Sequence, residues 1–89
     1  MVERELAIVN ELGLHARAAA KLVHVASSFR CRVIVVSGDE EVDAKSILGL
    51  LLLAAPMGSR LRVRCDGPDE ASAIESIAAL IADRFGESR

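Results

Sequence analysis

Between Arg60 and Cys65 the sequence alternates strictly between an arginine and an apolar residue. Because successive side chains of a β-strand point to opposite faces of the sheet, this alternation predicts a strand with one charged face and one apolar face. Such half-buried strands are typical of antiparallel sheets that pack against other elements on one side and meet water on the other. The rest of the chain must therefore supply further strands and a covering layer for a single face.

Three more segments have the composition of strands. Residues 3–9 fit a strand in which Arg4, Leu6 and Ile8 share one face, the likelier core face. Residues 31–36 form a largely β-branched run that is followed by the more polar residues 40–44. Between the last two segments, Gly38-Asp39 suits a two-residue hairpin turn with glycine at the first central position. We therefore expect these two strands to form a hairpin.

Three segments are predicted to be helices. The first spans residues 16–28, and its apolar face consists of Ala16, Ala19, Leu22, Val23 and Ala26. The second is the apolar run 47–55, which Ser46 can cap and Pro56 ends. The third follows Asp69, a candidate capping residue, and its apolar residues at helical spacing are Ile74, Ile77, Ala78, Ile81 and Phe85.

The predicted order of elements is β-α-β-β-α-β-α. This order favours an α+β fold, a two-layer open-faced β-sandwich in which helices cover one side of the sheet. The 89 residues, 52% of them hydrophobic, can form one hydrophobic core but not two. We therefore expect residues 1–89 to form a single domain that folds without a metal or a disulfide.

Charge and composition exclude several classes of protein. The 11 Lys and Arg against 13 Asp and Glu give a net charge of −2, and without Trp or Tyr the chain lacks the stacking surface of a nucleic-acid-binding protein. Cys31 and Cys65 have no histidine near them, so buried thiols are expected instead of a zinc site. The longest apolar run, residues 47–57, is broken by Gly49 and Pro56 and is too short to span a bilayer. We expect a cytoplasmic protein that binds no nucleic acid, membrane, metal or cofactor.

His15 is the strongest candidate for chemistry. It follows Gly13, which permits unusual backbone angles, and it precedes the first predicted helix, whose first N–H groups have no intrahelical partner. An oxyanion carried by the imidazole would meet the N–H groups of Ala16, Arg17 and Ala18 and the positive end of the helix dipole. A neutral imidazole in this position can accept a phosphoryl group and hand it on.

The charges near His15 in the sequence support this interpretation. No acidic residue lies between Glu11 and Asp39, and the stretch contains the basic residues Arg17, Lys21, Arg30 and Arg32. We therefore expect a locally electropositive site that suits phosphate. The simpler interpretation, an exposed histidine beside an arginine without a function, fits the spacing as well, and His24 is expected to be only a solvated surface residue.

Three runs of residues carry a resemblance to a known family. They are Gly13-Leu14-His15-Ala16-Arg17, Lys45-Ser46-Ile47-Leu48-Gly49-Leu50 and Gly67-Pro68-Asp69-Glu70. In these runs and in the order of its elements, the chain resembles the histidine-containing phosphocarrier (HPr) family of the bacterial phosphoenolpyruvate:sugar phosphotransferase system. The resemblance extends over nearly the whole chain. The resemblance implies a four-stranded antiparallel sheet in the order 1-4-2-3, covered on one side by three helices.

The resemblance also implies roles for single residues. His15 matches the histidine that phospho-enzyme I phosphorylates on Nδ1 and that passes the group to IIA proteins or domains, and Arg17 matches the arginine that steadies the phosphate. Ser46 matches a serine that HPr kinase/phosphorylase modifies in some lineages, although it could serve only as a helix cap. Ala18 stands where the family usually has proline, so the first turn loses a preset φ and gains an N–H. The chain would be a carrier without turnover of its own, not an enzyme.

The second predicted helix is expected to carry a docking surface. The resemblance places Ile47, Leu48 and Leu51 on the exposed side of this helix. Because a surface helix buries about one face, Leu50 and Leu53 are then assigned to the core. An exposed apolar patch beside a phosphate site suits enzyme I and IIA partners.

Two alternatives fit the same residues. A regulatory protein-interaction module, controlled by histidine or serine phosphorylation and without a transport role, would also carry an apolar helix, although the presence of both His15 and Arg17 favours the carrier. A carrier could serve either sugar uptake or a regulatory phosphotransferase branch. In each case we expect a monomer.

Overall fold

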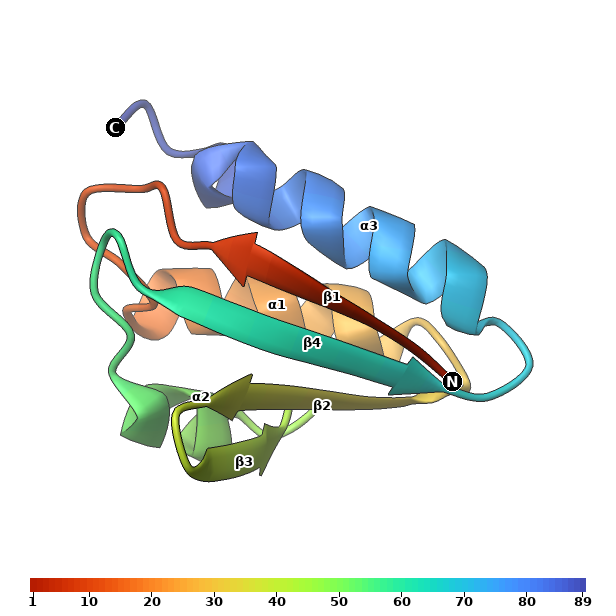
Figure 1. The fold of residues 1–89 in the computed structure, drawn as a ribbon. Helices are drawn as coiled ribbons and strands as arrows, with labels where there is room; N and C mark the ends of the chain where they lie inside the picture. The colour runs from red at the N-terminus through yellow and green to blue at the C-terminus, as the bar shows by residue number, and fades with distance from the viewer.

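The computed structural model describes residues 1–89 (Figure 1). The elements are β1 (Val2–Ala7), α1 (Ala16–Ser27), β2 (Arg32–Ser37), β3 (Glu40–Asp43), α2 (Ile47–Leu53), β4 (Arg60–Asp66), α3 (Glu70–Ala82) and a 3₁₀ turn, η1 (Arg84–Gly86). They follow one another in the predicted order. The hairpin between β2 and β3 has the expected turn, with Gly38 at a positive φ of 59°.

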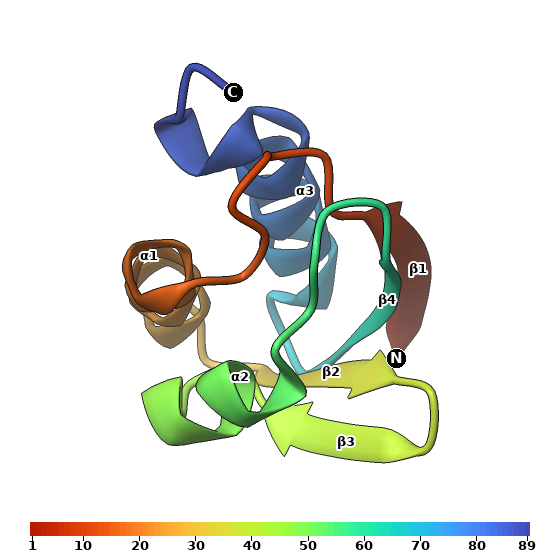
Figure 2. The ribbon, with the colours of Figure 1, turned by 90° about the vertical axis from the view of Figure 1, so that its left-hand side faces the viewer.

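The four strands form one antiparallel sheet in the order β1-β4-β2-β3. The three helices lie on the same side of this twisted sheet and leave its other face open (Figure 2). The predicted α+β open-faced sandwich, with strand order 1-4-2-3, is therefore confirmed. None of the helices combines the length and the apolar character that crossing a membrane requires.

The alternating strand β4 lies inside the sheet, between β1 and β2. Leu61 and Val63 are fully buried beneath the helices, whereas Arg60 and Arg62 are exposed on the open face. The pairing with β1 places glutamates near these arginines, and Arg60 Nη1 lies 3.0 Å from Glu5 Oε1. Because exposed ion pairs contribute little to stability, the main effect of the alternation is to decide which face of the strand is buried.

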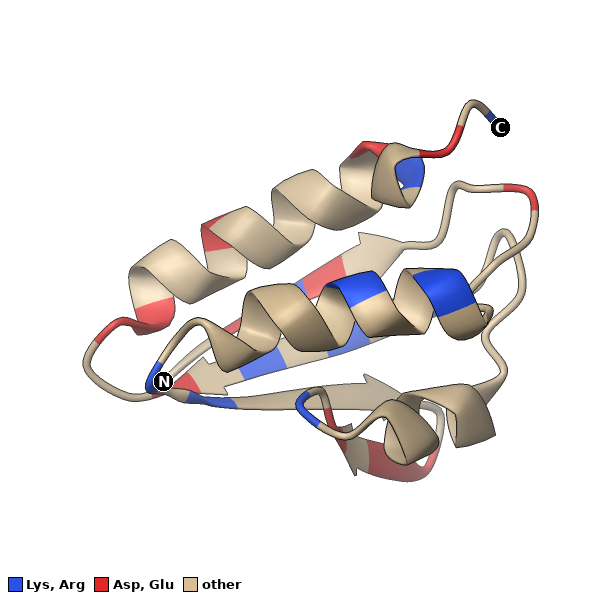
Figure 3. Cartoon of the chain, turned by 180° about the vertical axis from the view of Figure 1, so that it is seen from behind, with Lys and Arg blue, Asp and Glu red and all other residues tan.

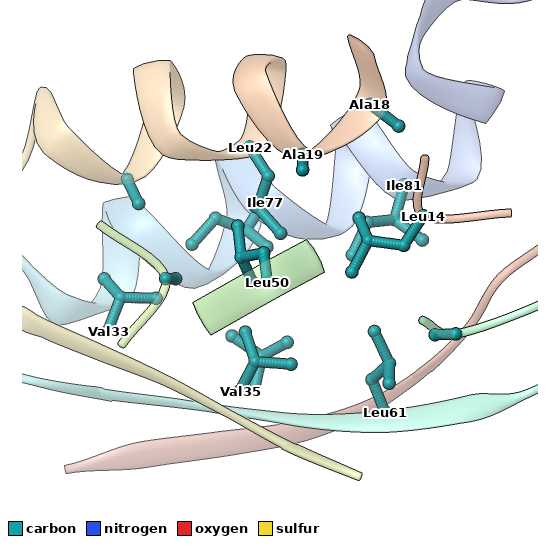
Figure 4. Close-up of a cluster of buried hydrophobic side chains, with 14 of the residues drawn as sticks. Leu14, Ala18, Ala19, Leu22, Val33, Val35, Leu50, Leu61, Ile77 and Ile81 are labelled. Atoms are coloured by element: carbon teal, nitrogen blue, oxygen red, sulfur yellow. The ribbon is translucent and has the colours of Figure 1, made fainter. Parts of the chain in front are cut away.

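The core lies between the sheet and the helices, and each helix contributes to it (Figure 4). Fully buried side chains from all three helices and two central strands meet there: Leu22, Val35, Leu50, Leu61 and Ile77. Burying a side chain of this size stabilises the fold by about 1.5–3 kcal/mol. Cys31 and Cys65 belong to the same cluster as free thiols, and burial raises the pKa of Cys65 to about 11.

The buried face of α1 differs from the predicted one. Ala16 is exposed, whereas Ala18 is fully buried together with Ala19 and Leu22. The placement of Ala16 on the apolar face was therefore wrong. The physical reason is that α1 contacts α2, α3 and η1, so more than one stripe of the helix is covered.

Both ends of α3 also differ from the prediction. Asp69 is in the N-cap position, but its carboxylate accepts hydrogen bonds from the N–H groups of Arg30 (2.8 Å) and Cys31 (2.9 Å) and makes no capping bond. These bonds, first the one from Arg30, hold the pKa of Asp69 below its usual value. At the other end the helix stops at Ala82, and Phe85, which was predicted to lie on it, is in η1 with a φ of 55°. The capping role of Asp69 and the helical placement of Phe85 were wrong.

Candidate functional site at the start of α1

Gly13 shapes the loop that leads into α1. Its φ is 68°, and a Cβ at this position would lie 2.5 Å from the carbonyl oxygen of Ala55, beyond the end of α2. The next residue, Leu14, donates its N–H to the same oxygen at 2.8 Å. Only glycine combines this φ with such a close approach, so the loop is held against the end of α2.

His15 is the N-cap residue of α1. Its backbone is extended (φ −83°, ψ −180°), and its ring Nδ1 accepts a hydrogen bond from the N–H of Arg17 at 3.3 Å. No backbone carbonyl accepts from the N–H groups of Ala16, Arg17 or Ala18, as expected for the first turn of a helix. The imidazole is 26% exposed. Nδ1 is therefore placed at the positive end of the α1 dipole, next to donors that can bind an anion.

The charges around His15 differ in part from the prediction. Arg17 and Lys21 lie on the first half of α1, beside the site (Figure 3). Arg30 and Arg32 follow the other end of this 12-residue helix, about 18 Å away along its axis. The expectation that all of these cations surround His15 was wrong, because the length of α1 separates them.

The structure adds two residues that sequence reasoning missed. Glu87 lies in the C-terminal tail, and its Oε2 is 2.6 Å from His15 Nε2. Its other oxygen, Oε1, accepts a hydrogen bond from Asn10 Nδ2 at 3.0 Å, and the same nitrogen donates to the Gly13 carbonyl at 2.8 Å. These hydrogen bonds, first the one to His15 and then the one to Asn10, hold the pKa of Glu87 below its usual value. The site therefore contains an ionised carboxylate as well as cations.

Apolar side chains of α2 lie next to this site. Ile47, Leu48 and Leu51 are exposed as expected, and Leu50 is fully buried. Leu53, which was assigned to the core, does pack against it but is only partly buried. Leu52, which was not singled out, has the largest exposed fraction in the helix, 74%. We call the residues Ile47, Leu48, Leu51 and Leu52 the α2 patch.

A shallow apolar hollow joins the α2 patch to His15. Its lining includes His15, Leu51, Leu12 of the loop before α1 and Pro56 of the loop after α2. Leu12 is also largely exposed. The imidazole and the α2 patch are therefore parts of one continuous surface.

Ser46 caps α2. Its backbone is extended, and its Oγ accepts a hydrogen bond from the N–H of Gly49 at 3.2 Å. A cap of this kind stabilises a helix by about 1 kcal/mol. The predicted capping role is confirmed, and the hydroxyl lies directly before the first residue of the α2 patch, Ile47.

Comparisons with known proteins agree with this fold. A family model described as "PTS HPr component phosphorylation site" matches residues 2–83. The phosphocarrier protein HPr of Cupriavidus necator is 49% identical over 87 residues, which cover 98% of each chain. A crystal structure of HPr from Thermoanaerobacter tengcongensis covers all of both chains with a TM-score of 0.96 and 38% identity. An HPr dimer from the same organism covers 98% of this chain and 100% of that one, with a TM-score of 0.79 and 39% identity.

The fold and the family match define the class: a small phosphocarrier protein. The family match and the near-complete coverage of these relatives identify it further: the chain belongs to the HPr family of phosphocarrier proteins of the phosphotransferase system. Such a protein is a carrier and is not a catalyst in itself.

The close approach at Gly13 predicts a stability difference between two glycine variants. Gly38 also has a positive φ, 59°, but a Cβ there would meet nothing within 4 Å. Gly38→Ala should therefore lower the free energy of unfolding only by the cost of placing alanine at a positive φ, about 1–2 kcal/mol. Gly13→Ala should lose at least twice as much, because the added Cβ also displaces the Ala55 carbonyl from Leu14. Urea unfolding of both variants measures the difference, and equal losses would contradict the role given to this contact.

Proposed function

We propose that this chain accepts a phosphoryl group on Nδ1 of His15 from phospho-enzyme I and passes it to IIA proteins or domains. The observation that carries the proposal is the N-cap position of His15, which places Nδ1 beside the first N–H groups of α1. In the transfer the Nδ1 lone pair attacks phosphorus while the bond from phosphorus to the donor group of enzyme I breaks. The phosphoryl oxygens then accept hydrogen bonds from the N–H groups of Ala16 and Arg17, and the helix dipole stabilises their negative charge. Ala18 is fully buried, so its N–H acts through the dipole and not by direct contact.

Arg17 supplies the fixed positive charge of the site. Its side chain is exposed, and no carboxylate lies within ion-pair distance of its guanidinium. It lines an open hollow together with Glu11, Glu87 and Arg89. The guanidinium is therefore available for charge-assisted hydrogen bonds to a phosphate on His15. Ala18, in place of the family's usual proline, adds one N–H to the same turn.

The two histidines of α1 provide a matched test. Incubation with enzyme I and phosphoenolpyruvate should label the wild-type chain with an acid-labile, alkali-stable phosphate. His15→Ala should take up none, because the attacking nitrogen is gone. His24→Ala should be labelled as the wild type, since His24 is an exposed residue near the other end of the helix.

Label on His15→Ala at the wild-type level would overturn the assignment of the acceptor. The same experiment separates the carrier from the alternative, a regulatory interaction module without a transport role. A wild-type chain that takes up phosphate but donates none to any IIA protein would support the module. Onward transfer supports the carrier.

The α2 patch is the docking surface for enzyme I and for IIA partners in this proposal. Its large exposed apolar side chains adjoin His15 through the hollow lined by Leu12 and Leu51. Both partners need the same imidazole, so both must cover the same surface, and one must leave before the other binds. Weak and rapidly exchanging complexes suit this alternation better than tight ones.

A charge placed in the α2 patch should weaken docking. Leu48→Asp should reduce the affinity for enzyme I and the rate of phosphoryl uptake about tenfold or more, equivalent to about 1.4 kcal/mol. The melting temperature should change little, because Leu48 is 69% exposed. Ser46→Asp, at the edge of the patch, should also reduce the affinity for enzyme I and the rate of phosphoryl uptake.

A matched control for these variants is Ser76→Asp, which adds the same charge to the exposed side of α3. It should bind enzyme I as the wild type does. Titration of labelled protein against enzyme I measures the affinities. Unchanged affinity of Leu48→Asp and Ser46→Asp would show that the partner does not use α2.

The remaining roles follow from the same surface. Phosphorylation of Ser46 by HPr kinase/phosphorylase would add about −1.5 to −2 charges at the edge of the α2 patch and oppose docking there.

In this proposal residues 1–89 act as a single HPr-like domain. The protein is a monomer in the cytoplasm and needs no metal or cofactor. Whether the carrier serves sugar uptake or a regulatory branch is decided by which IIA protein accepts its phosphoryl group. Light scattering measures the oligomeric state.

A further inference from the structure

The chain beyond α3 turns back toward His15 and is held there. Arg84, Phe85 and Gly86 all have positive φ (57°, 55° and 78°), a conformation that is unfavourable for the first two. Phe85 is fully buried, and its carbonyl oxygen accepts a hydrogen bond from Lys21 Nζ at 2.6 Å. Strain of this kind persists only where the surrounding structure enforces it, and it is concentrated at functional sites. Here it directs Glu87 onto the imidazole.

Asn10 fixes the orientation of the Glu87 carboxylate. It is the only buried polar residue of the fold, and its amide donates to both Glu87 Oε1 and the Gly13 carbonyl. Both partners can only accept, so the NH₂ group must face them. Asn10 Oδ1 is left buried without a partner. An unpaired buried oxygen is unfavourable. The NH₂ group of the same side chain holds the Glu87 carboxylate, which is itself only 13% exposed.

The two ring nitrogens of His15 face partners of opposite character. At Nε2 the neighbour is the Glu87 carboxylate, which can only accept, at 2.6 Å. At Nδ1 the neighbour is the Arg17 N–H, which can only donate, at 3.3 Å. A neutral imidazole satisfies both only with its proton on Nε2 and its lone pair on Nδ1.

From this geometry we infer that Glu87 is a positioning residue for phosphoryl transfer: it holds the proton on Nε2 of His15, directs the lone pair of Nδ1 to the phosphoryl group and stabilises the charge of the phosphorylated ring. Asn10 in turn positions Glu87. The inference rests on the proposed function of His15 as the acceptor.

The charge balance of the reaction explains why a carboxylate suits this place. When Nδ1 forms its bond to phosphorus and the donor's bond to phosphorus breaks, Nε2 keeps its proton and the ring becomes positive. Glu87 lies beside that charge, so its carboxylate, which faces a neutral N–H before the transfer, faces a cation after it, and the Coulomb attraction is added to the hydrogen bond. In onward transfer a nucleophile of the IIA partner forms its bond to phosphorus while the bond between phosphorus and Nδ1 breaks, and the electron pair of that bond returns to Nδ1. The leaving group is then a neutral imidazole, which leaves more readily than an imidazolate anion would.

Three variants separate orientation from charge. Glu87→Ala removes both, whereas Glu87→Gln has no charge and keeps one oxygen that can accept from Nε2–H, at the cost of the bond that Asn10 donates to the other oxygen. Glu75→Gln, on the exposed side of α3 where it pairs with Arg4, makes the same change in net charge away from the site. Two measurements apply to each: the rate of phosphoryl transfer with enzyme I and IIA, and the ring N–H signals of His15 in ¹⁵N-labelled, unphosphorylated protein.

In the wild type and in Glu75→Gln we expect a ring proton on Nε2 that exchanges slowly with water. Glu87→Ala should lose this signal to exchange and transfer about tenfold more slowly or worse. Glu87→Gln should keep the signal and still transfer more slowly. A role in folding alone would lower the melting temperature and leave the transfer rate of the folded protein unchanged.

Two results would overturn the inference: a wild-type imidazole with its proton on Nδ1, or a Glu87→Ala protein that transfers at the wild-type rate. These results are distinct from a failure of the proposed function, in which the wild-type chain itself takes up no phosphate on His15. In that case both proposals fall.

Discussion

Helices cover one face of the sheet, and the arrangement of the site depends on this constraint. The alternation in β4 leaves only one apolar face, so α1, α2 and α3 must share a single layer. In that layer the loop before α1, the loop after α2 and the tail after α3 come together at the same end of the molecule (Figure 1). Segments that are far apart in the sequence therefore meet around His15.

Each contact between these segments has a different role in the site. The hydrogen bond from Leu14 to the Ala55 carbonyl joins the loop before α1 to the end of α2, which keeps the imidazole beside the α2 patch. The start of α1 offers donors to a phosphate, and the tail offers a carboxylate to the opposite side of the ring. The chemistry at His15 and the docking at α2 thus belong to one surface but to different side chains. A change in one can leave the other intact.

The elements that could be predicted from sequence are those with a strong local pattern. The arginine alternation of β4, the hairpin turn at Gly38 and the cap at Ser46 depend on neighbouring residues, and all are present. The predictions that were wrong depended on distant contacts. Ala18 is buried because other elements cover more of α1 than one stripe, and Asp69 binds the loop before β2 instead of its own helix.

Glu87 shows the same limit within the site. It is separated from His15 by 72 positions, and it is aligned with the ring only because buried Phe85 turns the chain after α3. No sequence motif predicts a contact between two residues so far apart in the chain. The pair Phe85-Gly86, an aromatic residue and a glycine at the end of the predicted third helix, was the one local indication that the tail packs back onto the fold.

The central claim is that the fold presents Nδ1 of His15, and no other nitrogen, to a phosphoryl donor. Phosphorus–nitrogen coupling in the NMR spectrum of the ¹⁵N-labelled, enzyme I-phosphorylated chain tests it most directly. We expect coupling of phosphorus to His15 Nδ1, with the proton still on Nε2. Coupling to His15 Nε2 or to a nitrogen of His24 would contradict it.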